Sequence, residues 1–314
     1  MNRSHVTLFL IVVAGVSLLQ FGCSGSLKLG SLQSDELFQL GIKQYENHKY
    51  VKAIEIFQTV VYNFPGETVV DSAQYYLGLS YFGNKDYTLA EREFNRLMLN
   101  YPSSVYIVHA QFMRAVCFFE GTPKHYGLDQ SDLEIAIRHF EDFIIDHPES
   151  ELLPDTREYL LQARTRLAQK HYSNGMVYVH IRRKSAASTY FQKVIDDFTD
   201  TRYAAMASFQ LADLEYNTKQ FEKAHELFNN FLSVFPDHEW AEKASQRSEE
   251  AAFKNAKQAF ESGQMAAAKK LLESFLLDFP ESKRLEKADK YLKQIGETPV
   301  DESTVEQASS GTDG

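Results

Sequence analysis

Small and large apolar residues recur along this chain at helical spacing. Six times an alanine is followed four residues later by a large apolar residue, and twelve residues later by a position that stops a helix. The six sets are Ala53/Phe57/Pro65, Ala90/Phe94/Pro102, Ala136/Phe140/Pro148, Ala187/Phe191/Thr199, Ala224/Phe228/Pro236 and Ala268/Leu272/Pro280. Residues four apart share one helix face, and proline has no N–H to continue the ladder. Each set therefore predicts one amphipathic helix that ends before its stop position.

A second small residue upstream of each alanine indicates a partner helix. In five sets it lies twelve positions earlier, at Gly41, Gly78, Gly175, Ala212 and Ala256; in the third, Ala115 takes this role with nine extra residues in the turn. Small residues let paired helices approach closely. One helix pair cannot bury its apolar face alone, so successive pairs must stack. We predict an all-α, tetratricopeptide-like superhelix of about six helix pairs.

The six units differ in length, and a long helix in the fourth unit is expected to divide the chain into two groups of repeats. A helix from about Asp155 to Tyr178 has no internal proline and keeps one apolar face, so it is expected to join repeats one to three (34–148) to repeats four to six (149–296). Ser34 is expected to cap the first helix. Residues 297–314 are polar and acidic, which predicts a disordered tail.

The first 22 residues carry a different pattern. Arg3 precedes an apolar run, Val6–Leu19, that is shorter than the ~20 residues of a membrane-spanning helix. This is typical of a secretory signal, and an uncleaved anchor is the alternative. The segment ends in Gly22–Cys23 and resembles a bacterial lipoprotein signal, in which the cysteine is acylated and becomes the new N-terminus. Gln20 departs from the usual leucine, and Ser24 resembles the form sorted to the outer membrane.

Composition narrows the function classes. The 314 residues are 44% hydrophobic and 24% charged, as in soluble globular proteins, and the formal net charge is −10. Nucleic-acid binding and polybasic membrane patches need clustered Lys and Arg, so the acidic balance argues against both. Residues 23–33 are Gly/Ser-rich and predict a flexible tether. If Cys23 is acylated, Cys117 has no disulfide partner and is expected to be a small core residue.

Aromatic residues recur on the predicted first helix of each pair. They lie three residues before the small residue and four after it, a spacing that puts both on one helix face. In the first three units they are Phe38, Tyr45, Tyr75, Phe82, Phe112 and Phe119. These residues are candidates for a groove that receives extended, aromatic-rich peptides such as the C-termini of barrel proteins. Because the pattern persists in every unit, we favour the alternative that it is packing between repeats.

A basic run stands out in this acidic protein. Arg182 and Arg183, followed by Lys184, fall at the predicted turn between the helices of the fourth unit. They are candidates for docking an acidic partner surface. A solvated turn is an equally weighted alternative, because surface charges are normally solvated.

No set of residues is arranged for catalysis or for a cofactor. The histidines are scattered, with neither an HExxH nor a CxxC spacing for a metal. The chain has no Gly-rich phosphate loop and no GxSxG nucleophile motif. We therefore predict a non-enzymatic protein without metal or cofactor.

Taken together, the signal, the helix-pair units and the long third and fourth units resemble the BamD family of outer-membrane β-barrel assembly lipoproteins. The resemblance covers about Ser34–Asp237, and its most specific stretch runs from the loop Glu120–Asp132 to Tyr178. The long loop contains Asp129 and Gln130, which are expected to cap the following helix. Lys184 departs from the family's usual aromatic residue, and the sixth unit and tail extend past the family core.

The resemblance implies a periplasmic scaffold held at the outer membrane by lipid on Cys23. Its implied partners are the periplasmic domain of the barrel-insertion channel and unfolded outer-membrane proteins, with no nucleic acid. Asp129 and Gln130 would then also contact a partner.

Two other functions stay open. Tol–Pal-associated repeat proteins coordinate the cell envelope, but they usually lack a lipid and carry an N-terminal coiled coil. A scaffold for a peptidoglycan enzyme would need a further domain with a catalytic glutamate, and only a polar tail follows Gly296.

Overall fold

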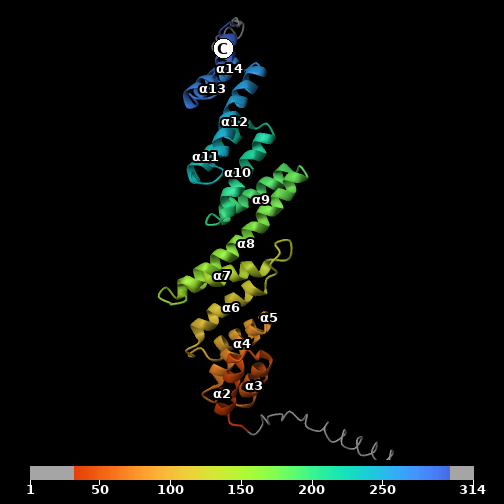
Figure 1. Cartoon of the computed structure of the whole chain (residues 1–314), viewed down its shortest axis with the longest axis vertical. Coiled ribbons are helices and arrows are strands. Elements are labelled where there is room, and N and C mark those ends of the chain that lie inside the picture. Colours follow the sequence, from red (N-terminus) through yellow and green to blue (C-terminus); the bar gives the residue numbers. More distant parts are fainter. Residues whose placement is uncertain (1–31, 298–314) are drawn as a thin grey trace, which may run out of the picture. The chain divides into compact units, whose positions relative to one another are not determined.

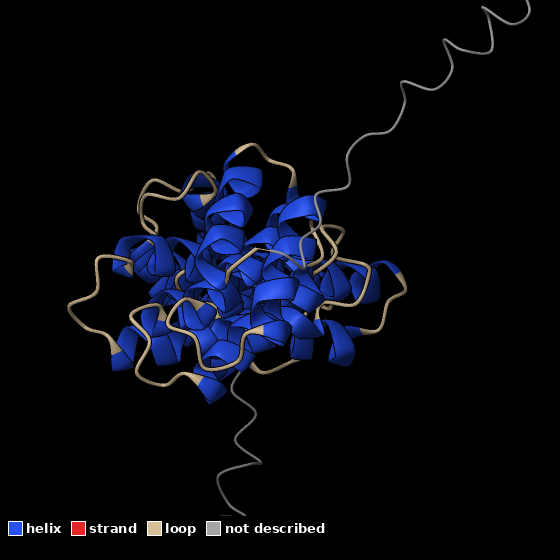
Figure 2. Ribbon diagram, turned by 90° about the horizontal axis from the view of Figure 1, so that it is seen from below, coloured by secondary structure: helices blue, strands red, loops and turns tan. Residues whose placement is uncertain are grey.

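The computed structural model describes residues 32–297, which form thirteen helices and no strand (Figures 1 and 2). Twelve of the helices form six pairs in chain order. The pairs are α2 (Ser34–Glu46) with α3 (Tyr50–Asn63), α4 (Val70–Gly83) with α5 (Tyr87–Asn100), α6 (Ile107–Gly121) with α7 (Ser131–Asp146), α8 (Leu153–His180) with α9 (Lys184–Asp197), α10 (Arg202–Asn217) with α11 (Phe221–Val234), and α12 (Ala241–Glu261) with α13 (Met265–Asp278); α14 (Leu285–Glu297) follows. The predicted all-α architecture of helix pairs is confirmed.

The chain divides into two compact units, Met1–Cys117 and Phe118–Gly314. Described residues of the first unit form α2–α5 and most of α6, and those of the second form the remaining helices. Each unit has its own apolar clusters. The grouping of repeats as 34–148 and 149–296 stays a prediction. The expected signal (1–22), Cys23, the tether up to residue 31 and the tail from residue 298 lie outside the described residues.

A buried ring of the second helix packs on the small residue of the first helix in three of the pairs. A Cβ atom added to the glycine would lie closer to that ring than real Cβ atoms approach a neighbour. The contacts are Gly41 with Phe57 (2.5 Å), Gly78 with Phe94 (2.7 Å) and Gly175 with Phe191 (2.6 Å). These glycines therefore permit a helix approach that any side chain would hinder.

The turn inside five of the pairs adopts one repeated conformation. Its middle residue has a positive φ: His48 (57°), Lys85 (68°), Arg182 (57°), Lys219 (63°) and Gly263 (76°). The N–H of the next residue donates to the carbonyl oxygen five residues earlier, at 2.9–3.0 Å in all five turns. This closure satisfies carbonyl groups at the end of the first helix. The turn residues thus mark where the first helix stops, and in all five turns the second helix starts two residues after the residue with positive φ.

The structure tests three local predictions, on the long helix, on the first helix cap and on Cys117. The long helix is confirmed and runs further at both ends, over Leu153–His180. The expected cap at Ser34 is wrong by one residue: Gln33 is the N-cap, and its N–H donates to the Glu36 carboxylate at 3.1 Å. Ser34 is already helical because this reciprocal cap forms one position earlier. Cys117 is the expected core residue, and burial raises the pKa of its thiol.

No helix among residues 32–297 combines the length and the apolar character that crossing a bilayer requires.

Candidate functional site

Five aromatic rings of the first unit form one connected cluster, which we call the aromatic cluster: Phe38, Tyr45, Tyr75, Tyr76 and Tyr106. Tyr76 lies at its centre, with ring centroids 5.9 Å from Phe38, 5.6 Å from Tyr45 and 5.7 Å from Tyr75. Tyr75 stacks on Tyr106 at 4.5 Å with an interplanar angle of 13°. The cluster therefore joins α2 to α4 and to the residue that precedes α6.

The hydroxyls of Tyr45, Tyr75 and Tyr76 in this cluster stay protonated. Burial raises the pKa of Tyr75 to about 12, and burial also raises the pKa of Tyr45 and of Tyr76. No other described residue forms a hydrogen bond with the hydroxyl of Tyr45, Tyr75 or Tyr76. A half-buried phenol without an internal partner can donate to a ligand or to water. The cluster thus combines apolar ring surface with available donors.

The six groove candidates take different positions. Phe38, Tyr45 and Phe82 are half-buried, whereas Tyr75, Phe112 and Phe119 are buried. Phe82 packs edge-on against Tyr87 at 5.3 Å. The buried members present little surface to a peptide, so a groove role rests on the half-buried rings.

The long loop between α6 and α7 is held from inside by Arg166 and Gln130. Arg166 on α8 donates to the carbonyl oxygens of Phe119 (3.2 Å), Thr122 (3.0 Å) and Pro123 (2.9 Å). The side-chain nitrogen of Gln130 donates to the Pro123 carbonyl oxygen at 2.7 Å, and Gln130 is 1% exposed. Gln130 is the N-cap residue of α7, but its side chain makes no capping bond. Its side chain fixes the loop and offers no surface to a partner.

Asp129 lies on the outside of the same loop. Its carboxylate accepts hydrogen bonds from the Ser131 N–H at 3.0 Å and the Ser131 hydroxyl at 3.1 Å. The bond from the Ser131 N–H is the main reason that the pKa of Asp129 is lowered. Asp129 therefore satisfies the first N–H of α7, as expected of a residue at this helix start.

The basic run lies beside exposed apolar side chains. Arg182 and Arg183 are exposed, and neither forms an ion pair with another described residue. Val177 and Ile181, on the last turn of α8 and just after it, are 56% and 57% exposed. We call Val177, Ile181, Arg182 and Arg183 the α8-end surface. Arg182 also lines a cavity of 310 Å³ between α8 and α10.

Lys184 differs from its two neighbours because it is committed to an internal contact. Its ammonium lies 2.5 Å from Glu215 Oε2, and Lys223 Nζ lies 3.1 Å from Glu215 Oε1. Glu215 is only 2% exposed. Burial by itself would raise the pKa of Glu215, but the two ammonium groups outweigh burial and lower it. The pair of lysines thus ties α9, α10 and α11 together around one carboxylate.

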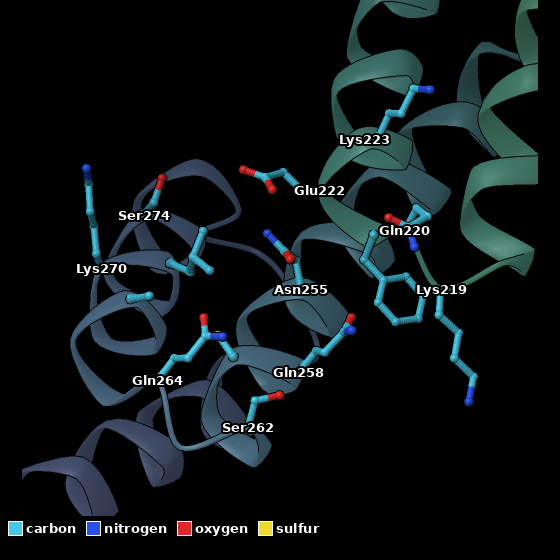
Figure 3. A pocket seen from close by; sticks show the side chains of 14 residues that line it. Lys219, Gln220, Glu222, Lys223, Asn255, Gln258, Ser262, Gln264, Lys270 and Ser274 are labelled. Atoms are coloured by element: carbon cyan, nitrogen blue, oxygen red, sulfur yellow. The ribbon is translucent and has the colours of Figure 1, made fainter.

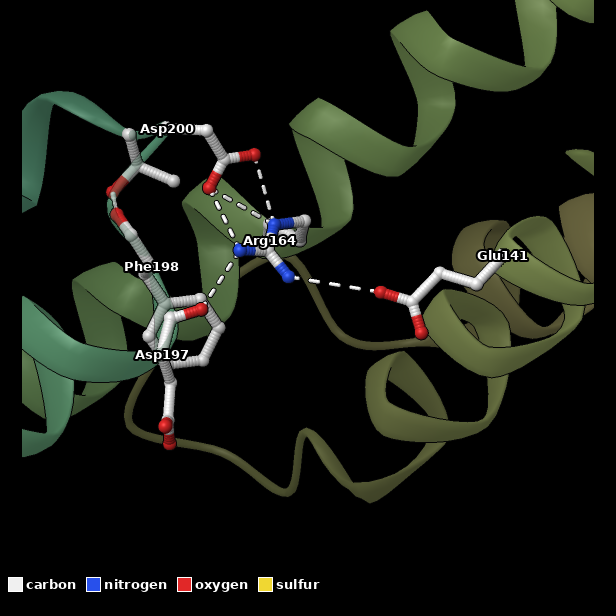
Figure 4. A network of polar contacts seen from close by, with 6 residues as sticks. Glu141, Arg164, Asp197, Phe198 and Asp200 are labelled. Atoms are coloured by element: carbon white, nitrogen blue, oxygen red, sulfur yellow. Dashed lines mark hydrogen bonds and ion pairs between the residues drawn. The ribbon is translucent and has the colours of Figure 1, made fainter.

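A second polar network joins α8 to α7 and to the end of α9 (Figure 4). Arg164 on α8 donates to both carboxylate oxygens of Asp200 at 2.8 Å and to the Asp197 carbonyl oxygen at 2.7 Å. It also lies 3.7 Å from Glu141 on α7, and its guanidinium sits 5.6 Å from the Phe198 ring centre. Bidentate arginine–carboxylate pairs are strong and directional. Arg164 therefore fixes α8 relative to its two neighbours.

Sequence reasoning missed Tyr76 and Tyr106, the rings that connect the aromatic cluster. Tyr76 adjoins Tyr75 and could have been noticed as a doubled aromatic position, but Tyr106 precedes its helix and follows no helical period. Among residues 32–297, no group of His, Cys, Asp and Glu side chains is placed to hold a metal ion.

Comparison with known proteins gives one family match. A family model described as "YfiO: Outer membrane lipoprotein" matches residues 31–215, more than half of the chain. No curated protein matches the chain. The match ends within α10, so α11–α14 lie beyond it.

Solved tetratricopeptide-repeat structures are similar at low identity. The TPR2AB domain of yeast Sti1 in complex with pHSP90 shares 12% identity, with 84% of this chain and 98% of that chain covered and a TM-score of 0.38. A thermophilic TPR protein from Thermus thermophilus shares 15% identity, with 70% and 98% covered and a TM-score of 0.31. A tetratricopeptide repeat protein from Parabacteroides merdae also shares 15%, with 87% and 96% covered and a TM-score of 0.31.

Proposed function

The chain belongs to the YfiO family of outer membrane lipoproteins, the BamD family, and from this premise we propose that it is a scaffold of the β-barrel assembly machinery. The family match over a helix-pair repeat fold is the observation that carries the proposal. In it, acylated Cys23 anchors the chain at the periplasmic face of the outer membrane. The chain holds the periplasmic domain of the barrel-insertion channel and receives unfolded outer-membrane proteins, without catalysing a reaction.

The aromatic cluster supports the substrate-binding part of this proposal. Unfolded barrel proteins expose aromatic side chains and unpaired backbone carbonyl groups. The half-buried rings of Phe38, Tyr45 and Tyr76 offer edge-to-face packing, and the tyrosine hydroxyls offer donors to a carbonyl group. Cluster members come from more than one helix pair, so an extended peptide can contact several of them in succession.

Tyr76→Leu is expected to weaken binding of an aromatic-ended barrel peptide about fivefold, because one aromatic contact is worth about 0.5–1.5 kcal/mol. Leucine keeps apolar contact with Phe57, on which the Tyr76 ring stacks at 5.9 Å. Fluorescence anisotropy with a labelled peptide measures the change. Tyr62→Leu, at a 58% exposed tyrosine of α3, is the matched control and should leave the affinity unchanged. Equal affinities for all three proteins would contradict a role for the cluster.

The α8-end surface supports the docking part of the proposal. Its two arginines carry unpaired charge, and Val177 and Ile181 supply apolar area next to them. Interfaces use arginine and apolar side chains in this combination, and complementary charge raises the association rate. Lys184 contributes to the fold and not to docking, since Glu215 already holds it. Arg164 and its hydrogen-bond partner Asp200 hold α8, the helix that carries this surface, in place.

Arg182→Glu/Arg183→Glu is expected to lower recovery of the channel protein from solubilised membranes about tenfold, because like charges then face an acidic partner surface. Affinity purification followed by quantitative mass spectrometry measures the recovery. Lys287→Glu/Lys290→Glu changes the net charge equally at two exposed positions of α14 and serves as control. If recovery of the channel protein is undiminished, Arg182 and Arg183 belong to a solvated turn and do not dock a partner. Purification of envelope-division proteins without the channel would count against the whole proposal.

A further inference from the structure

A second cavity lies in the part of the chain beyond the family match. It measures 580 Å³ and is lined by the start of α11, the end of α12 and the first turns of α13. Figure 3 shows Lys219 and Lys223 on the α11 side, Lys270 on the α13 side, and the amides of Asn255, Gln258 and Gln264 between them. Glu222 is the one carboxylate among its lining residues. The cavity is therefore a basic groove in an acidic protein.

The side chains of this groove suit an acidic polypeptide in an extended conformation. Lys219 and Lys270 are exposed, and neither forms an ion pair with another described residue. Lys223 forms an ion pair with Glu215. Ammonium groups pair with carboxylates, and side-chain amides pair with backbone N–H and C=O groups. Phe221 and Leu271 add apolar surface for an aliphatic side chain. The combination favours a peptide that alternates acidic and aliphatic residues.

The last helix packs beside the end of α12, which borders the groove. α14 begins shortly after α13 ends and shares one apolar cluster with α12 and α13. The Tyr291 ring of α14 lies 4.8 Å from Phe260, which is next to the last residue of α12. α12 ends where α13 begins, at residues 262–264, and Ser262 and Gln264 line the groove. The chain that follows Glu297 therefore starts within reach of the groove.

The segment that follows α14 has the complementary chemistry. Residues 298–314 contain Asp301, Glu302, Glu306 and Asp313, no Lys or Arg, and the aliphatic residues Val300 and Val305. Seventeen residues span up to ~55 Å when extended, whereas the fourteen residues of α13 are ~21 Å long. Attachment to the same chain also makes binding intramolecular, at an effective concentration of about a millimolar. Length, starting point and charge all favour this occupant over a separate molecule.

We propose that the groove between α11 and α13 binds the chain's own acidic segment, residues 298–314, with its carboxylates against Lys219 and Lys270. The proposal uses none of the residues assigned to substrate binding or channel docking, so it stands or falls separately from the scaffold function.

The test places a photo-crosslinking residue at Val305 in the full mature chain and maps the products by mass spectrometry. Crosslinks within one molecule are expected to residues 219–223 and 264–274. Lys219→Glu/Lys270→Glu is expected to lower their yield about fivefold, since each exposed ion pair contributes modestly. The yield should also fall as salt is added, because exposed charges are screened.

The control is Lys287→Glu/Lys290→Glu, which adds the same negative charge on α14 closer to the segment along the chain. It should leave the yield unchanged. All four lysines are exposed, so neither variant removes a core contact. An equal loss in both variants, no loss in the groove variant, crosslinks to other faces, or crosslinks only between molecules would each overturn the proposal. Capture of another envelope protein by a crosslinker at residue 270 in cells, with none to residues 298–314, would overturn it as well.

Discussion

Phe94→Ala is expected to lower the free energy of unfolding of the first unit by about 3–5 kcal/mol, the usual cost of emptying a core position of its phenylalanine. The Phe94 side chain is fully buried and packs between Gly78 of α4 and the Tyr75 ring, whose centroid is 5.8 Å away. Gly78 has no side chain that could move into the space. The cavity would therefore stay open and separate the two helices of the second pair.

Urea denaturation and amide hydrogen exchange measure this loss. In a stack of repeats each pair contacts only its neighbours, so exchange should increase first in α4 and α5. Leu99→Ala removes a side chain of similar kind from the same helix, but Leu99 is 72% exposed, so its effect should stay within about 0.5 kcal/mol. Similar losses for both variants would show that Phe94 is not the centre of this packing.

The reciprocal substitution tests the small-residue rule. Gly78→Ala places a methyl group 2.7 Å from the Phe94 ring, and overpacking of this kind costs about 1–3 kcal/mol. Phe94→Leu in the same chain shortens the opposing side chain and should recover part of that loss. The sixth pair carries this combination already, with Ala256 and Leu272 both fully buried. If the changes in the free energy of unfolding of the two single variants simply add in the double variant, the two positions are not in direct contact.

The helix pairs were predictable because their determinants are local. An alanine, an apolar residue four positions later and a stop position lie within one helix, so a single period reveals them. The second helices do end two residues before Pro65, Pro102, Pro148, Pro236 and Pro280. The left-handed residues in the turns escaped prediction, because four of the five are not glycine and their conformation follows from helix closure.

The site was less predictable because its contacts join distant residues. Arg164 and Asp200 are 36 positions apart, and Arg166 reaches carbonyl groups of the loop over more than 40 positions. Gln130 was expected to cap the following helix with its side chain, yet that side chain turns inward to the Pro123 carbonyl group. The groove beside Lys270 carries no sequence motif, since three helices contribute to its lining. Periodicity describes one helix and says nothing about which helices meet.

Cys23→Ser is expected to release essentially all of the protein from the membrane fraction into the soluble periplasm. In the proposed function two or more acyl chains on Cys23 provide the anchor, and each buried CH₂ group contributes about 0.8 kcal/mol. Serine cannot form the thioether, so no acyl chain is attached at this position. The variant is exported behind a signal that is cleaved without acylation, so that residues 1–22 are removed. The described helices offer no membrane-spanning substitute.

Membrane fractionation with an alkaline carbonate wash, together with labelled palmitate, measures this loss. The wash removes proteins held only by partner contacts, so it separates lipid anchoring from docking to the channel. Cys117→Ala is the matched control: that thiol is 2% exposed in the core, and its loss should leave both label and membrane attachment intact. If the processed Cys23→Ser protein resists the wash without label, something other than acyl chains on residue 23 holds it in the membrane. A lipid-anchored scaffold requires the opposite, with the label and the attachment lost together.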